Sequence, residues 1–168
     1  MTSQLKAQTG EPDANERLTV IHGLGKAELD AIEVLGFQLY QQGRNREADT
    51  IFGGLIALNS RMYKGYAGKG ALALAELRLD EALTWLKQAL ERNPDDPTVH
   101  ANLGETLPRL NRFDEAAAHF ERALALDPEE TDDGANRARA ILAGMRAIVR
   151  ETEDLEPETQ LSDENHEK

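Results

Sequence analysis

Small and large apolar residues recur along the middle of this chain at a fixed spacing of 34 residues. Glycine occupies one position of this pattern, alanine a second, and a large apolar residue a third. The five columns with this spacing are Gly36, Gly70 and Gly104; Ala48, Ala82 and Ala116; Phe52, Leu86 and Phe120; Leu55, Ala89 and Ala123; and Ser60, Pro94 and Pro128. No insertion is needed to align the three copies, so the pattern predicts three tandem repeats over residues 29–62, 63–96 and 97–130.

Within each repeat the column chemistry predicts two helices packed against each other. The glycine and alanine columns let the helices approach closely, and the large apolar residue fills the space between them. Pro94 and Pro128 stop the second helix because proline cannot continue a helix. This helix–turn–helix pattern resembles the tetratricopeptide repeat over residues 29–130. We therefore expect an all-α fold, a right-handed superhelical array of three such repeats.

Two residues depart from the simplest form of the repeat, one at a turn and one near a helix end. The turn between the two helices favours a left-handed residue, which Gly43 and Asn111 supply. The second repeat has Leu77 at this position, so its turn is expected to be strained or differently shaped. Pro108 is expected to end or kink the first helix of the third repeat.

Two adjacent glycines, Gly53 and Gly54, lie inside the second helix of the first repeat. Each costs about 1 kcal/mol relative to alanine in a helix interior. Close contact with a neighbouring helix is the favoured interpretation, and contact with a second subunit is the alternative.

The ends of the repeat array need covering, because each repeat leaves an apolar face for a neighbour. One helix face is indicated by the spacing of Ala138, Ile141, Leu142, Met145, Ile148 and Val149. It predicts a capping helix over residues 131–151. Residues 1–13 and the acidic tail 152–168 contain few apolar residues and are expected to be disordered. Residues 14–28 form either a short N-terminal helical segment packed on the first repeat or an exposed arm that pairs with a second copy.

Composition narrows the possible partners. The chain has no cysteine, which excludes disulfides and thiolate metal sites. The formal net charge is −12, of which residues 151–168 carry −7, so nucleic acid and anionic membranes would be repelled. Neither a secretory signal nor an apolar run long enough to insert into a membrane is apparent, and we expect a cytoplasmic protein.

Catalytic chemistry is not indicated by the sequence. The four histidines form no pair at helical spacing, and His100 falls in a packing column. His119 follows Glu115 by one helical turn, but a metal or acid–base role would require a cavity. The acidic run DPEETDDG lacks the central glycine and terminal glutamate of a calcium loop. No enzyme activity, cofactor or metal is expected.

A peptide-binding groove is predicted on the face formed by the first helices of the repeats. The positions that face it are Asp30, Glu33, Phe37, Tyr40 and Gln41 in the first repeat; Lys64, Ala67, Ala71, Leu74 and Ala75 in the second; and Thr98, Ala101, Glu105, Pro108 and Arg109 in the third. From these, the binding residues are predicted to be Phe37, Tyr40, Gln41, Lys64, Ala67, Ala71, Leu74, Ala101 and Glu105. Small side chains in the middle leave room for large side chains of an extended peptide. Core packing remains an equal alternative for the alanines and Leu74.

One known binding mode fits this groove poorly. Tetratricopeptide domains that hold chaperone C-termini clamp a terminal carboxylate with lysine, asparagine and arginine. The corresponding groove here begins with Glu33 and Phe37 and has Lys64 as its only central cation, so a carboxylate would be poorly neutralised.

A narrower resemblance concerns residues 28–83. The stretches LYQQGRNREADTIF and YKGYAGKGA, with the size and acidic balance of the chain, resemble the class II chaperones of type III secretion systems. The resemblance implies a bacterial cytoplasmic protein that holds an extended segment of a translocator. It implies contacts from Phe37, Tyr40, Lys64, Ala67, Ala71 and Leu74, and a homodimer through residues 14–35. A general scaffold that joins folded protein partners, or a self-assembling structural protein, remains the alternative.

Overall fold

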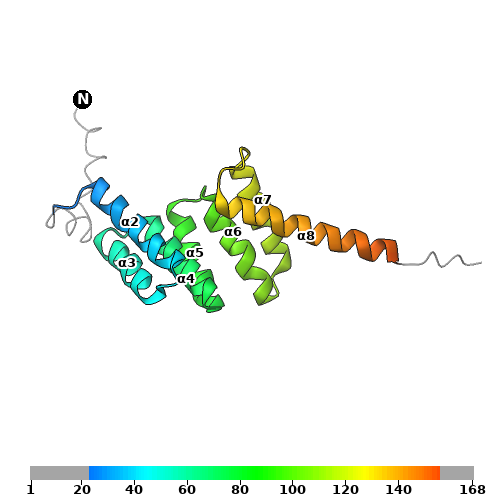
Figure 1. Ribbon diagram of the computed structural model, residues 1–168, viewed down its shortest axis with the longest axis horizontal. Coiled ribbons are helices and arrows are strands. Elements are labelled where there is room, and N and C mark those ends of the chain that lie inside the picture. Colours follow the sequence, from blue (N-terminus) through cyan, green and yellow to red (C-terminus); the bar gives the residue numbers. More distant parts are fainter. Residues whose placement is uncertain (1–22, 156–168) are drawn as a thin grey trace, which may run out of the picture.

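The computed structural model describes residues 23–155, with the backbone alone for residues 152–155. Within this range the chain is entirely helical, which confirms the expected all-α class of tetratricopeptide-like repeats. The elements are α2 (Lys26–Gln41), α3 (Asn45–Leu58), α4 (Tyr63–Ala75), α5 (Leu79–Arg92), α6 (Pro97–Thr106), the 3-10 helix η1 (Leu107–Leu110), α7 (Phe113–Leu126) and α8 (Asp133–Leu155). The pairs α2/α3, α4/α5 and α6/α7 follow one another along the molecule, and α8 lies at the end of the array (Figure 1).

The glycine column permits the close approach within each helix pair. A Cβ atom at Gly36 would lie 2.8 Å from the ring of Phe52, and one at Gly104 would lie 2.5 Å from the ring of Phe120. At Gly70 the contact would be with Leu86, at 2.6 Å. These distances are shorter than van der Waals contact. Because glycine has no side chain, the large residue of the second helix can occupy this space on the first helix.

The turns within the three repeats share one shape. Gly43, Leu77 and Asn111 have positive φ angles of 72°, 58° and 59°. In each turn this residue donates its N–H to the carbonyl oxygen three residues earlier, at 2.9–3.0 Å. The next residue, an arginine in every repeat, donates to the carbonyl five residues earlier. Leu77 therefore adopts the strained left-handed conformation and does not alter the turn.

The other two departures have different outcomes. As expected, the α-helical part of the first helix in repeat three stops early, because α6 ends at Thr106 and the segment containing Pro108 is 3-10 helix. The close-contact interpretation of the glycine pair is wrong. A Cβ atom at Gly53 would be 3.7 Å from the flexible end of Lys69, and one at Gly54 would meet nothing within 4 Å.

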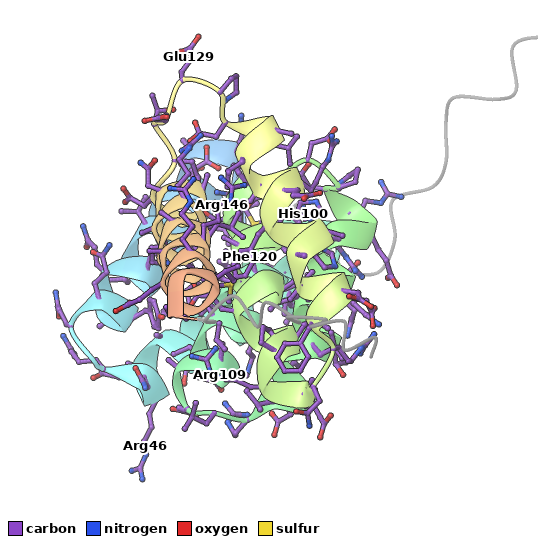
Figure 2. All side chains as sticks on the ribbon, turned by 90° about the vertical axis from the view of Figure 1, so that its right-hand side faces the viewer. Arg46, His100, Arg109, Phe120, Glu129 and Arg146 are labelled. Carbon is purple, nitrogen blue, oxygen red and sulfur yellow. The ribbon has the colours of Figure 1, made fainter. Side chains whose placement is uncertain are left out.

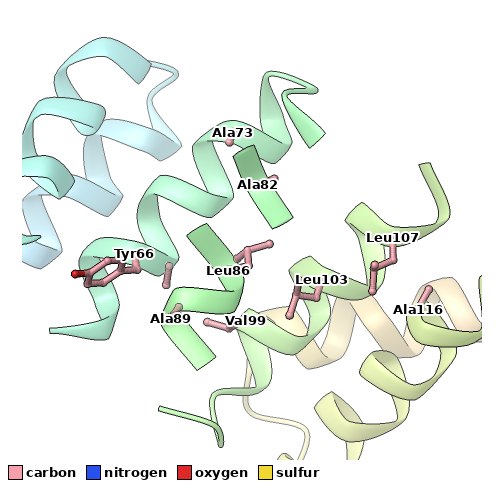
Figure 3. Close-up of a cluster of buried hydrophobic side chains, with 10 residues drawn as sticks. Tyr66, Ala73, Ala82, Leu86, Ala89, Val99, Leu103, Leu107 and Ala116 are labelled. Carbon is pink, nitrogen blue, oxygen red and sulfur yellow. The ribbon is translucent and has the colours of Figure 1, made fainter. Parts of the chain in front are cut away.

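The buried core is continuous from one repeat to the next. The central cluster joins the second and third repeats through Leu86, Val99, Leu103 and Leu107 (Figure 3). A second cluster, around Phe52, fills the first repeat and includes Leu72 of α4. Because each cluster takes residues from neighbouring repeats, the helices of the array are held in fixed relative positions.

The helix α8 covers the end of the array with its first half only. Ala135 and Ala138 are fully buried, and Ile141 and Leu142 pack against the cluster around Phe120. Met145, Ile148 and Val149 belong to the same predicted face but are exposed. This second half extends beyond the other helices (Figure 1), and Arg146 lies on it in the view along α8 in Figure 2.

The C-terminal helix α8 is longer than the predicted capping helix. The expectation that residues 152–155 are disordered is wrong, because α8 continues to Leu155. A long helix with good helix formers propagates past its last packed turn at little cost. The predictions for residues 1–13, 14–22 and 156–168 lie outside the described residues.

Candidate peptide-binding cleft

A cleft of about 640 Å³ runs along the face formed by α2, α4 and α6 and reaches the start of α8. It contains eight of the nine predicted binding residues: Phe37, Tyr40, Gln41, Lys64, Ala67, Ala71, Leu74 and Glu105. The helical register found from the repeat therefore brings these side chains to one hollow surface. Whether they bind a peptide stays a prediction.

The placement of Ala101 in the groove is wrong. Its side chain is fully buried and packs with Phe120, Ala123 and Ala138. Ala138 belongs to α8, which covers this side of α6, and the neighbouring residue Asn102 lines the cleft instead. Asp30 and Pro108, which the register also turned toward the groove, do not line it, whereas Glu33, Ala75, Thr98 and Arg109 do.

Several lining residues were not found from the sequence. Asn102 lies on α6, next to the predicted Ala101, and the others come from turns and from the cap: Leu77, Asp96, Asp132, Asp133 and Arg137. Apart from Asn102, these residues lie outside the first helix of each repeat, so the repeat register does not predict them. The signal for Leu77 was nevertheless present, because a leucine at a position that favours glycine or asparagine is unusual.

The middle and one end of the cleft are apolar. The ring of Phe37 meets that of Phe52 edge to face, with 5.0 Å between the centroids. Ala67 and Ala71 are 6% and 9% exposed, so each packs in the core and presents only a small part of its side chain to the cleft. Both alternatives left open by the sequence, packing and groove lining, therefore hold for these alanines. A floor of small side chains leaves space for larger apolar side chains of a bound chain.

A lysine and a glutamate face each other across the cleft between α2 and α4. Lys64 Nζ lies 3.4 Å from Glu33 Oε1 and 5.2 Å from the ring centre of Tyr63. Burial opposes the charge of Lys64, but Tyr63 and the Glu33 carboxylate outweigh it and raise the pKa of Lys64 above its usual value. The lysine is therefore charged, and its charge is already neutralised within the cleft.

Hydrogen bonds connect α6 to the start of α8 at the polar end of the cleft. Arg137 donates to Asn102 Oδ1 at 2.9 Å and to Glu105 Oε1 at 3.2 Å. Thr98 Oγ1 donates to the carboxylate of Asp132 at 3.0 Å. The same carboxylate accepts the N–H of Ala135 at 2.8 Å and so caps α8. The polar end is thus built by the capping helix as well as by the repeats.

A histidine pair lies apart from this cleft. His100, which is 8% exposed, and His119 face each other with 2.9 Å between their Nδ1 atoms. His100 Nε2 is 3.0 Å from the carbonyl oxygen of Pro94, which can only accept, so His100 donates there and accepts from His119. The packing role expected for His100 agrees with its burial. Glu115, one helical turn before His119, forms a two-bond ion pair with Arg112.

Among the side chains described between residues 23 and 151, no three from His, Cys, Asp or Glu gather as they would to hold a metal ion. Over the same range, no helix has the length and apolar character needed to cross a membrane.

Comparison with known proteins assigns the repeats to a family. The family model described as tetratricopeptide repeat matches residues 38–97, 68–131 and 101–144. These matches cover more than half of the chain, so the protein belongs to the tetratricopeptide repeat family.

Among curated proteins the similar ones are much larger. Protein O-mannosyl-transferase Tmtc3 of Drosophila melanogaster is 32% identical over 102 residues, which are 59% of this chain and 11% of that protein. Protein arginine N-methyltransferase 9 of Homo sapiens is 40% identical over 55 residues, or 33% of this chain and 6% of the enzyme. The chain thus spans about a tenth of the length of these relatives.

Solved structures that resemble the whole array include translocator chaperones. The type III secretion translocator chaperone SycD of Yersinia enterocolitica has a TM-score of 0.64 and 19% identity, and the match covers 76% of this chain and 96% of that one. PcrH in complex with the chaperone binding region of PopD has a TM-score of 0.62 and 27% identity, covering 74% and 96%. PcrH with the corresponding region of PopB has a TM-score of 0.60, also at 27% identity, covering 70% and 97%. The fold is that of class II translocator chaperones.

Proposed function

We propose that this protein is a cytoplasmic secretion chaperone that holds an extended apolar segment of a translocator in the cleft between α2, α4, α6 and α8. The observation that carries the proposal is the cleft floor of small side chains, Ala67, Ala71 and Ala75, beside Phe37 and Tyr40. Such a surface accepts spaced large side chains of an extended chain and removes them from water.

Two further observations support the proposal. PcrH, with the same fold and 27% identity, is solved with chaperone binding regions of PopB and PopD. Two ionic pairs within the cleft, Lys64–Glu33 and Arg137–Glu105, neutralise charges next to the apolar floor. A client would therefore be held mainly by its apolar side chains, which is what keeping an aggregation-prone segment soluble requires.

The test is an affinity pull-down from the native organism, with bound proteins identified by mass spectrometry. Wild-type protein is compared with Ala71→Glu and with Ala75→Glu, because Ala75 lines the cleft but is exposed and tolerates a larger side chain without core disruption. Ala118→Glu, at an exposed position of α7 away from the cleft, is the matched control. Circular dichroism establishes that each variant remains helical.

We expect one dominant export-type client, retained by Ala118→Glu and lost by both cleft variants. If a folded Ala75→Glu protein retained that client, binding of the client in the cleft would be contradicted. Several soluble partners, bound regardless of the cleft substitutions, would instead favour a scaffold.

The scaffold is the second candidate function. It is favoured by the curated relatives, in which the similar segment is 6–14% of a much larger protein. The state of the bound partner distinguishes the two candidates. A client that is folded and active within the complex indicates a scaffold, whereas an unfolded or protease-sensitive client indicates a chaperone.

Self-association through residues 14–35 belongs to the same proposal. Within the described part of this segment, Val34 and Leu35 of α2 are 54% and 44% exposed. Apolar side chains on an outer helix provide a contact for a second copy. Light scattering of wild-type protein and of Val34→Glu measures this directly: a dimer that persists in the variant would place the interface elsewhere.

A further inference from the structure

A leucine occupies the left-handed position of the second turn, where the other two repeats have glycine and asparagine. Leu77 has φ of 58° and donates its N–H to Leu74 O at 3.0 Å, the same bond that Gly43 and Asn111 make in their turns. Any residue could make this main-chain bond. The left-handed conformation is unfavourable in free energy for leucine, which has a Cβ atom, but not for glycine.

Burial contributes little to keeping the side chain of Leu77 in place. It is 66% exposed, the largest exposed fraction among the exposed large hydrophobic residues in the described part of the chain. The turn is anchored by Arg78, which pairs with Glu76 and Glu81, and not by the leucine side chain. Backbone strain that is not offset by packing of the side chain within the fold points to a function for that side chain.

Leu77 lies on one rim of the cleft. Gln41, Ala75 and Arg109 occupy one column of the 34-residue repeat, and all three line the cleft at the end of the first helix of their repeats. Leu77 also lines it, two residues after Ala75 and therefore on the same rim. This rim borders the apolar end of the floor, at Tyr40 and Leu74.

A cation lies on this rim without a carboxylate partner. Arg109 is exposed, and its guanidinium donates to the main-chain oxygen of Glu105. Among the described residues it forms no ion pair, unlike Arg137, whose charge is paired with Glu105. An exposed guanidinium and an exposed apolar side chain that line the same cleft are together complementary to a segment that carries both a carboxylate and a large apolar residue.

We propose that Leu77 and Arg109 form a specificity rim, in which Leu77 contacts a large apolar side chain of the bound segment and Arg109 pairs with an adjacent carboxylate. The inference rests on the proposed function and names the chemistry of its client: an extended segment in which a large apolar residue neighbours Asp or Glu. The strain at Leu77 is retained because this side chain serves binding.

The experiment uses a phage library of random 12-residue peptides, selected on the full chain and counter-selected on Ala75→Glu. Selected peptides are synthesised with a fluorescent label and titrated against wild-type protein, Leu77→Gly and Arg109→Gln. Phe113→Ala is the matched control, because Phe113 is 62% exposed but lies outside the cleft. Thermal unfolding is measured for every variant.

We expect Leu77→Gly to raise the unfolding temperature by about 3 °C while weakening peptide binding about tenfold. Arg109→Gln should weaken binding only of peptides with the neighbouring carboxylate, and Phe113→Ala should bind as the wild type. This opposite change in stability and affinity is not produced by a purely structural residue.

The outcomes separate the two proposals. Peptides that bind wild-type protein, are lost on Ala75→Glu and bind Leu77→Gly with unchanged affinity would overturn the specificity rim and leave the cleft in place. Selected peptides without the paired apolar and acidic residues would overturn it as well. A library that yields no cleft-dependent peptide would contradict the proposed function itself, and the rim with it.

Discussion

At the scale of single residues, most departures from the repeat pattern have a local physical meaning. Leu77 adopts the left-handed backbone conformation of its turn although this is unfavourable for leucine. Ala101 is buried against the capping helix and does not line the cleft. Gly54 is different, because no neighbouring atom lies where its side chain would be. Gly54 lies inside a helix, and no packing contact in the described structure requires a glycine there.

Replacing Gly54 with alanine should therefore stabilise the protein. The substitution lowers the conformational entropy of the unfolded chain and meets no steric obstacle, so the free energy of unfolding should rise by about 1 kcal/mol. Urea unfolding followed by circular dichroism measures the change. Gly36→Ala is the opposing control, since its Cβ would lie 2.8 Å from Phe52 and should destabilise. A destabilised Gly54→Ala protein would indicate a contact outside the described residues, such as a second subunit.

The histidine pair makes stability depend on pH. Burial, followed by the effect of nearby His100, lowers the pKa of His119 below its usual value; Lys87 and Arg112 act in the same direction and Glu115 against it. The unfolded chain then binds a proton more readily than the folded one. The stabilising contribution is present above about pH 6.5 and is lost as pH falls through the folded pKa.

The measurement is the free energy of unfolding between pH 7.5 and pH 5 for wild-type protein and His119→Gln. Wild-type protein should lose more stability on acidification than the variant, whose glutamine carries no titrating group but can still donate to His100. Equal losses in the two proteins would contradict the assignment.

At the scale of elements, one carboxylate fixes the loop between α7 and α8. Asp127, 6% exposed, accepts the N–H groups of Thr131 and Asp132 at 3.0 and 3.2 Å and pairs with Arg139 at 3.0 Å. Burial opposes its charge, but these bonds prevail and lower the pKa of Asp127 below its usual value. The capping helix is thereby attached to the last repeat.

Asp127→Ala should loosen α8 without unfolding the repeats. The substitution leaves the two N–H groups and the Arg139 guanidinium without their acceptor, so α8 opens more often. Hydrogen exchange followed by mass spectrometry should show faster exchange in residues 133–145, with α2 and α3 unchanged. Uniform acceleration through the whole chain would show instead that the repeats and the cap unfold as one unit.

The elements were largely predictable from the sequence, because their determinants are local or repeat at a fixed interval. The glycine column and the phenylalanine and leucine column together define the pairing of helices, and prolines mark their ends. The relation between elements was less accessible. The burial of Ala101 depends on α8, and the meeting of His100 with His119 joins residues 19 positions apart on two helices. Neither contact has a periodic signal.

At the scale of the whole molecule, three repeats and a cap enclose one cleft with an apolar floor and a polar end. Eight predicted residues line it, because a constant repeat length turns the same side of each first helix toward the cleft. Apart from Asn102 of α6, the lining residues that the register did not predict belong to the turns and to the start of α8. The cleft is thus a property of the assembled array, and the proposed client would contact every repeat at once.

Site-specific photo-cross-linking tests this central claim most directly. The photoreactive residue p-benzoylphenylalanine is placed at Tyr40, in the cleft, or at Phe113, which is exposed on α7 outside it. Irradiation is carried out in cells of the native organism, and adducts are identified by mass spectrometry. We predict that position 40 cross-links to an apolar segment of one client and that position 113 does not. Adducts of the client at position 113 with none at position 40 would contradict binding in the cleft.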